Sequence, residues 1–272
     1  MMTSDEALAF KVLERFAADR IPGLVQKVIE PLFGAAEDCL KQARFRDPRY
    51  LSWADKTDVV DSGFALLKPD LAPEVLGKVT HALFYEQLLR IQYRPGYWGD
   101  SDRKPEAKPV MPLAMVESGG LVYMVAAMEK YLAEPTLYRL DRIVDLEVLP
   151  ERFSYPRDFK LGEYIGTRRE FDFFPQGLIR LEVAFRGNAG EHLKETPLSA
   201  DQTLKRMQDG RLKASGTVML SLKLRRWLRS LGPAVEVLAP AKLRAEFAEE
   251  ARLIAEQYGA SRNASTSPPQ AQ

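Results

Sequence analysis

Arginine and tyrosine side chains in one stretch of the sequence have the types and spacing to bind a ligand. Arg139 and Arg142 lie on either side of Asp141, within a run that otherwise has the apolar pattern of core strands. Tyr123 and Tyr138 belong to the same run. Arginine binds phosphate through two parallel hydrogen bonds, and a tyrosine ring provides a stacking surface for an unpaired base. These residue types are compatible with an anionic or nucleic-acid-like ligand.

A basic segment closer to the C-terminus is a second candidate for binding phosphate. Between Lys205 and Arg229, eight basic residues accompany a single acidic one, Asp209. Such an excess of one charge predicts a local surface that attracts phosphate. The alternative is that the helix expected over 221–231 needs a polar face, which Lys and Arg provide without a partner. The residues assigned to this possible nucleic-acid patch are Arg206, Arg211, Lys213, Arg225, Arg226 and Arg229.

The sequence contains no recognisable catalytic constellation. It has no G-x-S-x-G, no phosphate-binding loop, no dinucleotide-binding glycine pattern and no H-E-x-x-H. His81 and His192 have no serine or cysteine nearby, so neither is a good candidate for a catalytic base. Carboxylate pairs such as Glu249/Glu250 fall on solvated faces, where nothing would raise a pKa. We therefore expect no catalytic residue, and the protein is not expected to be an enzyme.

Composition excludes several classes of protein. Of the 272 residues, 46% are hydrophobic and 28% charged, and the formal net charge of +1 indicates no particular partner. The single cysteine, Cys39, excludes an internal disulfide, and two histidines are too few for a Cys/His zinc site. No run approaches the ~20 apolar residues of a membrane span. We expect a cytoplasmic protein of two or three domains, with no metal, no cofactor and no membrane association.

The first 83 residues are expected to be helical. Thr3 and Glu6 have the spacing of a capping box at the start of a first helix. A second helix follows, which we expect Pro31 to kink or interrupt. Residues 72–84 again have helical periodicity. We interpret 1–83 as a helical linker and dimerisation region.

Residues 84–150 have the alternation and turn signals of short β-strands, which predict a small barrel. The polar insert at 96–108 carries Tyr97 and Trp98. We interpret this insert as a mobile loop tip in preference to a recognition loop. The strand candidates are LLRIQYR, PVMPLAMVE, GGLVYMVAAM, TLYRL and IVDLEVL.

A connector at 151–176 leads to a second mixed region at 177–258. Its strand–helix–strand–strand–helix–strand order is the ferredoxin-like pattern, followed by one further helix, so the fold class is α+β. Ser221 is a candidate helix cap, and 259–272 is predicted to be a disordered tail. The expected strands are 178–185, 201–206, 212–219 and 234–240, and the expected helices are 187–195, 221–231 and 241–258.

Several of these stretches resemble one known family. LRIQYRP, PVMPLAMVESGGLVYMVA and LYRLDRI are similar to the WYL domain of bacterial transcriptional regulators, an Sm-like β-barrel, and RLDRI is the most specific element. LIRLEVAFRG and the residues from WLRSLGPAVEVLAP to EQY are similar to the C-terminal extension that follows many WYL domains. DEALAFKVLERFAADRIP resembles the helical stretch that precedes them. The resemblance covers nearly the whole chain and implies an Sm-like barrel followed by a ferredoxin-like module.

The sequence departs from the family pattern in three places. Val122 and Met124 stand where Trp and Leu flank the tyrosine in the motif that names the family, and both are still apolar strand residues. Thr136 stands where a further arginine often falls, which would weaken or alter a ligand site. Regulators of this family begin with a winged helix-turn-helix, and no segment in 1–85 has that pattern. Three explanations fit: the DNA-binding domain was removed, the gene start is placed too far downstream, or the protein is naturally effector-only.

The resemblance also implies a role for the arginines and tyrosines. In WYL proteins the barrel is regarded as a sensor whose basic and aromatic residues contact a ligand, with nucleic-acid fragments among the ligands proposed. The alternative is that Arg142 pairs with Asp141 or Asp145 and that Tyr123 lies in the core, with no ligand. The ligand-binding residues assigned by the resemblance are Tyr93, Tyr123, Tyr138, Arg139 and Arg142.

The leading hypothesis is the effector-sensing portion of a bacterial WYL-type transcriptional regulator, which binds a nucleic-acid-like or other anionic ligand and controls an upstream DNA-binding domain. We expect a homodimer, a single-stranded nucleic-acid fragment as ligand, and duplex DNA only through a domain absent from this sequence. The resemblance suggests phage defence or the DNA damage response as the setting. The alternative is a stand-alone accessory protein of a defence system that binds single-stranded nucleic acid through the basic patch. A third hypothesis is an inert dimerisation scaffold with purely structural arginines.

Overall fold

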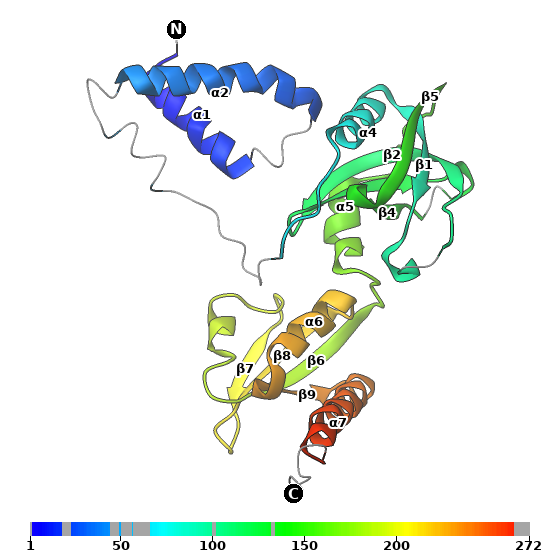
Figure 1. The fold of residues 1–272 in the computed structure, drawn as a ribbon. Coiled ribbons are helices and arrows are strands. Elements are labelled where there is room, and N and C mark those ends of the chain that lie inside the picture. The colour runs from blue at the N-terminus through cyan, green and yellow to red at the C-terminus, as the bar shows by residue number, and fades with distance from the viewer. Residues whose placement is uncertain are drawn as a thin grey trace, which may run out of the picture. The chain divides into compact units, whose positions relative to one another are not determined.

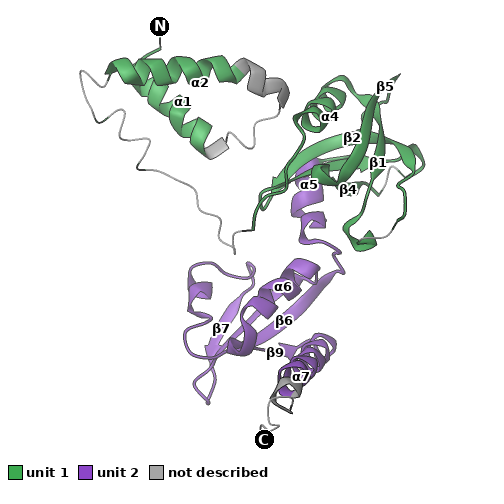
Figure 2. Ribbon diagram, viewed as in Figure 1, with its two compact units in different colours: residues 1–160 green, residues 161–272 purple. Residues whose placement is uncertain are grey.

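The computed structural model describes residues 2–17, 23–43, 49, 56, 66–99, 102–131 and 134–263. It divides the chain into two compact units, residues 1–160 and residues 161–272 (Figure 2). The boundary falls inside the segment predicted to be a connector. The main cores of the two units share no residue, so each unit buries its own apolar side chains.

Two helices, α1 (Ser4–Ala17) and α2 (Gly23–Ala43), pack against each other at the start of the first unit (Figure 1). The predicted capping box is confirmed. The Thr3 N–H donates to Glu6 Oε2 over 2.7 Å, and the Glu6 N–H donates to Thr3 Oγ1 over 3.2 Å. Two donors at the helix start are thereby satisfied by one pair of side chains. Between the helices, Ala7 packs against Ala36 and Leu40.

Of the kink or interruption expected at Pro31, the interruption does not occur, because helix α2 continues through this residue. A proline inside a helix removes one backbone donor and crowds the preceding turn. The turns after Pro31 are held by packing on α1. Phe33 contacts Phe10 edge to face, with ring centroids 6.4 Å apart, and Ala36 and Leu40 are buried. Because tertiary packing contributes more to a helix than local propensity does, the helix persists.

A five-stranded antiparallel sheet follows, in the order β4-β3-β2-β1-β5. Strand β2 joins its two halves: residues 107–110 of β2 pair with β1, and residues 111–118 pair with β3. The pairing with β3 has a register shift between Pro112 and Ala114. Such a shift bends a strand and strengthens its twist. The elements are α4 (Pro73–Tyr85), β1 (Gln87–Tyr93), β2 (Ala107–Ser118), β3 (Leu121–Ala127), β4 (Thr136–Arg139) and β5 (Ile143–Arg152).

The core of the first unit lies between α4 and this sheet. Val79 and Ala82 of α4 pack with Leu89 and Ile91 of β1 and with Met124 of β3, and all five are completely buried. Pairing within the described residues does not join β4 to β5, so a closed barrel is not shown. Three short 3-10 helices lie in the connections: η3 (Gly96–Trp98) in the predicted polar loop, η4 (Glu129–Tyr131), and η5 (Leu140–Arg142) between β4 and β5.

The second unit contains a four-stranded antiparallel sheet in the order β7-β8-β6-β9. Ser221 caps α6 as predicted, because its Oγ accepts from the Leu224 N–H over 3.2 Å. The elements are α5 (Leu161–Gly166), η6 (Glu170–Asp172), β6 (Leu178–Phe185), η7 (Glu191–Lys194), β7 (Thr203–Arg206), β8 (Leu212–Met219), α6 (Leu222–Ser230), η8 (Gly232–Ala234), β9 (Val235–Ala239) and α7 (Ala241–Asn263).

One core holds the sheet and the helices of the second unit together. Leu193 of η7, Leu228 of α6 and Leu243 of α7 pack in the same cluster as Leu181 and Phe185 of β6. These three helices therefore cover one face of the sheet. The strands lie where the sequence predicts them, with their bounds within two residues of those expected.

Two elements of the second unit differ from the sequence prediction. The helix expected over 187–195 is the single 3-10 turn η7, which follows Gly190 at the point where this glycine lies close against the Phe185 ring. Helix α7 is longer than expected and reaches Asn263, within the predicted tail. Arg252 pairs with Glu249 and Glu256 across its turns, which supports the helix. Residues 264–272 of the predicted tail lie outside the described residues.

The contact between Gly190 and Phe185 makes a stability prediction. A Cβ added at Gly190 would lie 2.6 Å from two atoms of the buried Phe185 ring. We expect Gly190→Ala to lower the free energy of unfolding of the second unit by roughly 1–3 kcal/mol, because the ring has no space to move into. Gly162→Ala is the matched control, since no atom lies within 4 Å of the added carbon. Urea denaturation measures both, and equal stability of the two variants would contradict the prediction.

Candidate ligand-binding site

The pairing of β3 with β4 decides which tyrosines belong to the core. Tyr123 lies opposite Arg139, and Met124 lies opposite Tyr138. Because side chains alternate along a strand, Tyr123 and Arg139 share one face and Tyr138 points to the other. Tyr138 is 3% exposed within the core of the first unit. The structure therefore makes Tyr138 a support for the site and not a stacking surface.

Tyr93 connects this core to the strand that carries the arginines. Its ring packs edge to face against Tyr138, with centroids 5.0 Å apart. Its hydroxyl oxygen accepts from the Arg139 backbone N–H over 3.4 Å. The end of β1 is thus tied to the end of β4. This contact brings together Tyr93, Tyr123, Tyr138 and Arg139, which are separated by up to 46 residues in the sequence.

Arg139 is already occupied by an acidic partner. Its Nε donates to Asp141 Oδ1 over 3.0 Å and its Nη2 donates to Oδ2 over 2.7 Å, a bidentate arrangement. Both side chains are mostly buried, and the Asp141 carboxylate raises the pKa of Arg139. Arg139 cannot bind a ligand with the same two nitrogens unless this pair opens. The alternative expected from the sequence paired Asp141 with Arg142, and the structure shows the other arginine instead.

Arg142 differs from Arg139 in its partners. It lies at the end of η5, is half-buried, and has no ion pair with any residue that the structure describes. Its guanidinium group lies against Gly96, where an added Cβ would be 2.7 Å from Arg142 Nη2. The Arg94 N–H donates to the Arg142 carbonyl over 3.1 Å and ties the same loop to η5. Arg142 is therefore positioned without being neutralised.

The environment of the Tyr123 hydroxyl shows that these charges converge. Tyr123 is 6% exposed, and burial raises the pKa of its hydroxyl above the usual value of 10.0. The positive charges of Arg139 and Arg142 act in the opposite direction and lower this pKa. The Tyr123 hydroxyl therefore lies within the positive potential of the two arginines. The arrangement suits an anion held at Arg142 beside the Tyr123 hydroxyl.

The basic segment of the second unit does not form the excess of positive charge that its sequence indicates. Carboxylates from other parts of the chain neutralise all of the assigned residues except Arg226, for which the described residues contain no ion-pair partner. The count of charges along 205–229 included only Asp209 among these carboxylates, because the others lie outside the segment. The pairs are Arg206 with Glu191, Arg211 with Asp209 and Glu236, Lys213 with Glu182, Arg225 with Glu246, and Arg229 with Glu250.

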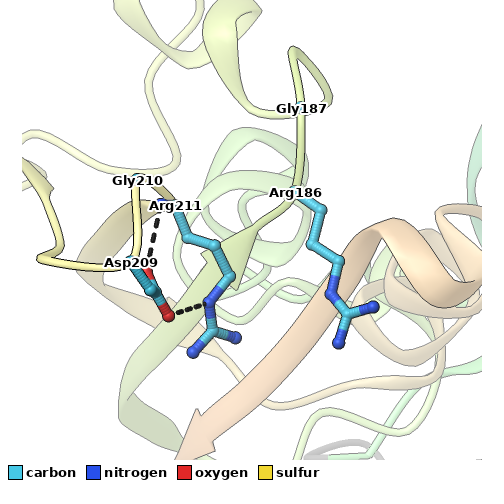
Figure 3. A pocket seen from close by; sticks show the side chains of 5 residues that line it. All are labelled: Arg186, Gly187, Asp209, Gly210 and Arg211. Atoms are coloured by element: carbon cyan, nitrogen blue, oxygen red, sulfur yellow. Dashed lines mark hydrogen bonds and ion pairs between the residues drawn. The ribbon is translucent and has the colours of Figure 1, made fainter.

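A cavity of about 400 Å³ lies beside the turn between β7 and β8. Figure 3 shows the Arg186 and Arg211 side chains extending in the same direction, with Asp209 bonded to Arg211. Arg186 is exposed and has no ion pair within the described part of the chain. Sequence reasoning assigned it no role because it precedes the basic segment. An exposed single cation interacts weakly with anions in water, so this cavity is a weaker candidate than Arg142.

The other candidates of the sequence analysis remain outside any site. His81 packs its ring on Tyr85 with centroids 4.5 Å apart, and His192 is exposed. Within the described ranges, no group of three or more His, Cys, Asp or Glu side chains could hold a metal ion. None of the described helices is long and apolar enough to cross a membrane.

Two family profiles match the chain. Residues 74–148 match the WYL domain, and residues 177–255 match the WCX domain. The first match covers the five-stranded sheet and most of α4, together with all five ligand-binding residues assigned above. The second covers the four-stranded sheet and the helices on it.

Comparison with solved structures finds distant similarities. Proteasome accessory factor B/C (PafBC) of Arthrobacter aurescens is 18% identical, with a TM-score of 0.32, and the match covers 99% of this chain and 36% of that one. A CRISPR Cas-related protein is 12% identical, with a TM-score of 0.44, and the match covers 72% of this chain and 52% of that one. The chain thus spans about a third of the length of the first and half of the second. No curated protein matches the sequence.

The effect of both arginines on Tyr123 predicts that removing one of them changes the pKa of the Tyr123 hydroxyl. Arg142→Gln removes one of the two positive charges that lower the pKa of Tyr123, so this pKa should rise further. Because the folded state binds this proton more tightly than the unfolded state, the stabilisation is present below about pH 10 and is lost as the pH rises through the folded pKa. Titration of ¹³C-tyrosine signals by NMR measures the change.

Arg90→Gln is the control for this titration. Arg90 lies on β1 of the same sheet, is half-exposed and pairs with Glu147. Its removal should leave the pKa of Tyr123 unchanged. If both variants shift the pKa equally, the effect is one of overall charge and Arg142 does not lie at the hydroxyl.

Proposed function

We propose that this chain, which carries a WYL domain followed by a WCX domain, is the effector-sensing portion of a bacterial transcriptional regulator. In this proposal the WYL domain binds a nucleic-acid-like or other anionic ligand, and the bound state is passed to a DNA-binding domain. The protein acts in the cytoplasm and has no catalytic step. Phage defence and the DNA damage response are the settings that the family resemblance suggests.

The availability of Arg142 is the observation that carries the proposal. The half-buried guanidinium group of Arg142 lies against Gly96 and forms no ion pair among the described residues. A phosphate would satisfy it through charge-assisted hydrogen bonds. Burial raises the pKa of the Tyr123 hydroxyl, so this hydroxyl is neutral at physiological pH and adds no negative charge to the site. Arg139 contributes positive potential while its own nitrogens bind Asp141.

The proposal includes finer assignments for the two sheets. For the first sheet we propose an Sm-like barrel, supported by five antiparallel strands and by the bend in β2. For the second we propose a ferredoxin-like module with a reduced first helix. Its support is the antiparallel order β7-β8-β6-β9, with η7 and α6 on one face.

The alternative hypothesis, a stand-alone protein that binds single-stranded nucleic acid through the basic patch, has less support. Five of its six residues are engaged with carboxylates. Such pairs must open before phosphate can bind. Affinity from this surface would therefore be low, and we assign single-strand binding to the WYL domain instead.

Fluorescence anisotropy of the full chain with labelled single-stranded and duplex oligonucleotides tests the proposal. We expect micromolar single-strand binding that weakens with salt, and roughly ten- to a hundredfold weaker binding by Arg142→Ala, because a hydrogen bond to a charged group contributes about 1.5–3 kcal/mol. The dependence of log affinity on log salt should also fall by about one. Arg142→Ala is preferred to Arg139→Ala because it leaves the Arg139–Asp141 pair intact.

The control for this experiment is Arg90→Ala, which removes one positive charge from the same sheet. It should bind the single strand nearly as well as the unchanged protein. Equal affinities of the two variants, with circular dichroism showing both to be folded, would refute the proposed site. Absence of binding to every oligonucleotide would refute a nucleic-acid ligand and direct the search to other anions.

We also propose that the protein is a homodimer that associates through α1 and α2. The support is the apolar surface left on this helix pair, where Leu13 is 55% and Leu32 is 40% exposed. Sedimentation equilibrium should give twice the chain mass. Leu32→Glu should shift the equilibrium toward the monomer, because a carboxylate would be desolvated at the interface. Leu253→Glu, at a similarly exposed position on α7, should not, and a monomeric starting protein would contradict this part.

A further inference from the structure

The second unit contains a cavity of about 500 Å³ that has no part in the proposed function. We call it the α6 pocket, since the first turns of α6 form one of its walls. The segment from α5 to η6 forms a second wall, and β8 forms a third. Its size is that of a small-molecule site. Apolar and polar side chains line different parts of it, as detailed below.

The polar part of the α6 pocket is a carboxylate with two cations. The Asp172 side chain is only 9% exposed, and its Oδ2 accepts from Arg169 Nε over 2.7 Å. Lys223 Nζ lies farther away, 3.8 Å from Asp172 Oδ1, and its side chain is 67% exposed. Two positive charges and one negative charge leave one net positive charge in the lining. Because Lys223 is loosely held, it can turn toward an anion without leaving Asp172 unpaired.

Two hydroxyl groups in the same lining already donate their hydrogens to a carboxylate. Ser199 Oγ donates to Asp201 Oδ1 over 2.6 Å, and Thr217 Oγ1 donates to Asp201 Oδ2 over 2.7 Å. Their hydrogens are used, so toward the pocket they offer only acceptor lone pairs. An anion would be repelled there and is expected near Lys223. The pocket also adjoins the first turn of α6, whose backbone dipole favours a negative charge.

The rest of the lining is apolar. Leu224 and Trp227 come from α6, Met219 from the end of β8, and Leu178 from the start of β6. Leu178 is 68% exposed although it begins a strand whose later residues form the core. A ligand with an aromatic or aliphatic body would cover these side chains. The favourable free energy would come from removing their surface from water.

The wall between α5 and β6 is held in an uncommon backbone conformation. Arg169, Phe173 and Phe174 have φ of 56°, 59° and 51°, in the left-handed region that non-glycine residues rarely adopt. The wall is fixed by backbone bonds: the Leu222 N–H donates to the Phe173 carbonyl over 3.0 Å. Several such residues together persist only where their surroundings enforce them, and they occur often at ligand clamps. The pocket is thus formed before any ligand binds.

We propose that the α6 pocket binds a small organic anion, in which one carboxylate or phosphate group is joined to an aromatic or aliphatic body. The anion contacts Lys223 and Arg169, and the body lies against Trp227, Met219 and Leu224. The site lies wholly within the second unit and shares no residue with the Arg142 site. It would give the protein a small-molecule input that is separate from its nucleic-acid ligand.

NMR of the full chain with ¹³C-methyl methionine tests the proposal, with Met219→Leu used to assign the Met219 signal. The probes are phenyl phosphate and benzoate, which combine both features. Benzyl alcohol provides the body alone, and inorganic phosphate provides the anion alone. We expect a saturable shift of Met219 with one or both aromatic anions, at an affinity about tenfold or more above that of either partial probe. The preferred probe identifies phosphate or carboxylate as the favoured anion.

Two charge reversals on the same helix separate local from general effects. Lys223→Glu should weaken binding of the preferred probe about tenfold, because it replaces the mobile cation by an anion. Arg226→Glu makes the same charge change at an exposed position of α6 that does not line the pocket, and should leave affinity nearly unchanged. Leu178→Trp, at an exposed lining position, should also weaken binding by filling the space.

The outcomes that would overturn the proposal are distinct from those that concern Arg142. If neither aromatic anion causes a saturable shift of the Met219 signal, the proposed site is wrong. If benzyl alcohol binds as tightly as the aromatic anions, the negative charge makes no contribution and the proposed anion contact is wrong. Equal weakening by Lys223→Glu and Arg226→Glu would show a general charge effect in place of a built site. Oligonucleotide binding through Arg142 is unaffected by any of these results.

Discussion

The bidentate pair between Arg139 and Asp141 determines what the first unit presents to a ligand. It spans the junction of β4 and η5, and both partners are mostly buried, so the direction of the turn is held by a charge-assisted contact. The carboxylate of Asp141 accepts both of these bonds from Arg139. Arg142, at the other end of the same turn, is consequently left with a positive charge and no ion pair among the described residues. Had Asp141 paired with Arg142, the available cation would lie on β4, opposite Tyr123.

The same competition for carboxylates has the opposite result in the second unit. There the arginines and lysines of β7, β8 and α6 meet acidic residues from η7, β6, β9 and α7, and most of them are neutralised. Surface pairs of this kind contribute little to stability. They do reduce the positive potential of this surface, which weakens its attraction for anions. Among the described residues, Arg142, Arg186 and Arg226 are examples of arginines that form no ion pair, and Arg142 is the half-buried one.

Each unit buries one sheet face under helices and does so with its own core, which allows the two domains to carry separate sites. In the first unit the residues proposed to bind a ligand lie at or next to strand ends, at Tyr93, Arg139 and Arg142, while mostly apolar side chains fill the core. In the second unit the cavity lies between the first turns of α6, the β8 strand and a wall of unusual backbone. Helices and strands therefore surround both candidate sites, and the charged residues of each site lie at or near the ends of these elements.

The amino-acid sequence by itself determined the helix cap at Thr3 and Glu6, the positions of the strands, the cap at Ser221 and the order of elements in both units. These features depend on residues close together in the chain, so local periodicity and spacing are sufficient to predict them. Three results needed the tertiary structure: the continuity of α2 through Pro31, the reduction of the helix expected at 187–195 to one turn, and the choice of Arg139 over Arg142 as the partner of Asp141. The continuity of α2 depends on packing against Phe10, and the short helix at 187–195 lies where the chain packs against Phe185. The choice of Arg139 depends on the direction in which each arginine side chain leaves the turn. The net charge of the basic segment also needed the tertiary structure, because a count along 205–229 cannot include carboxylates that folding brings from elsewhere in the chain.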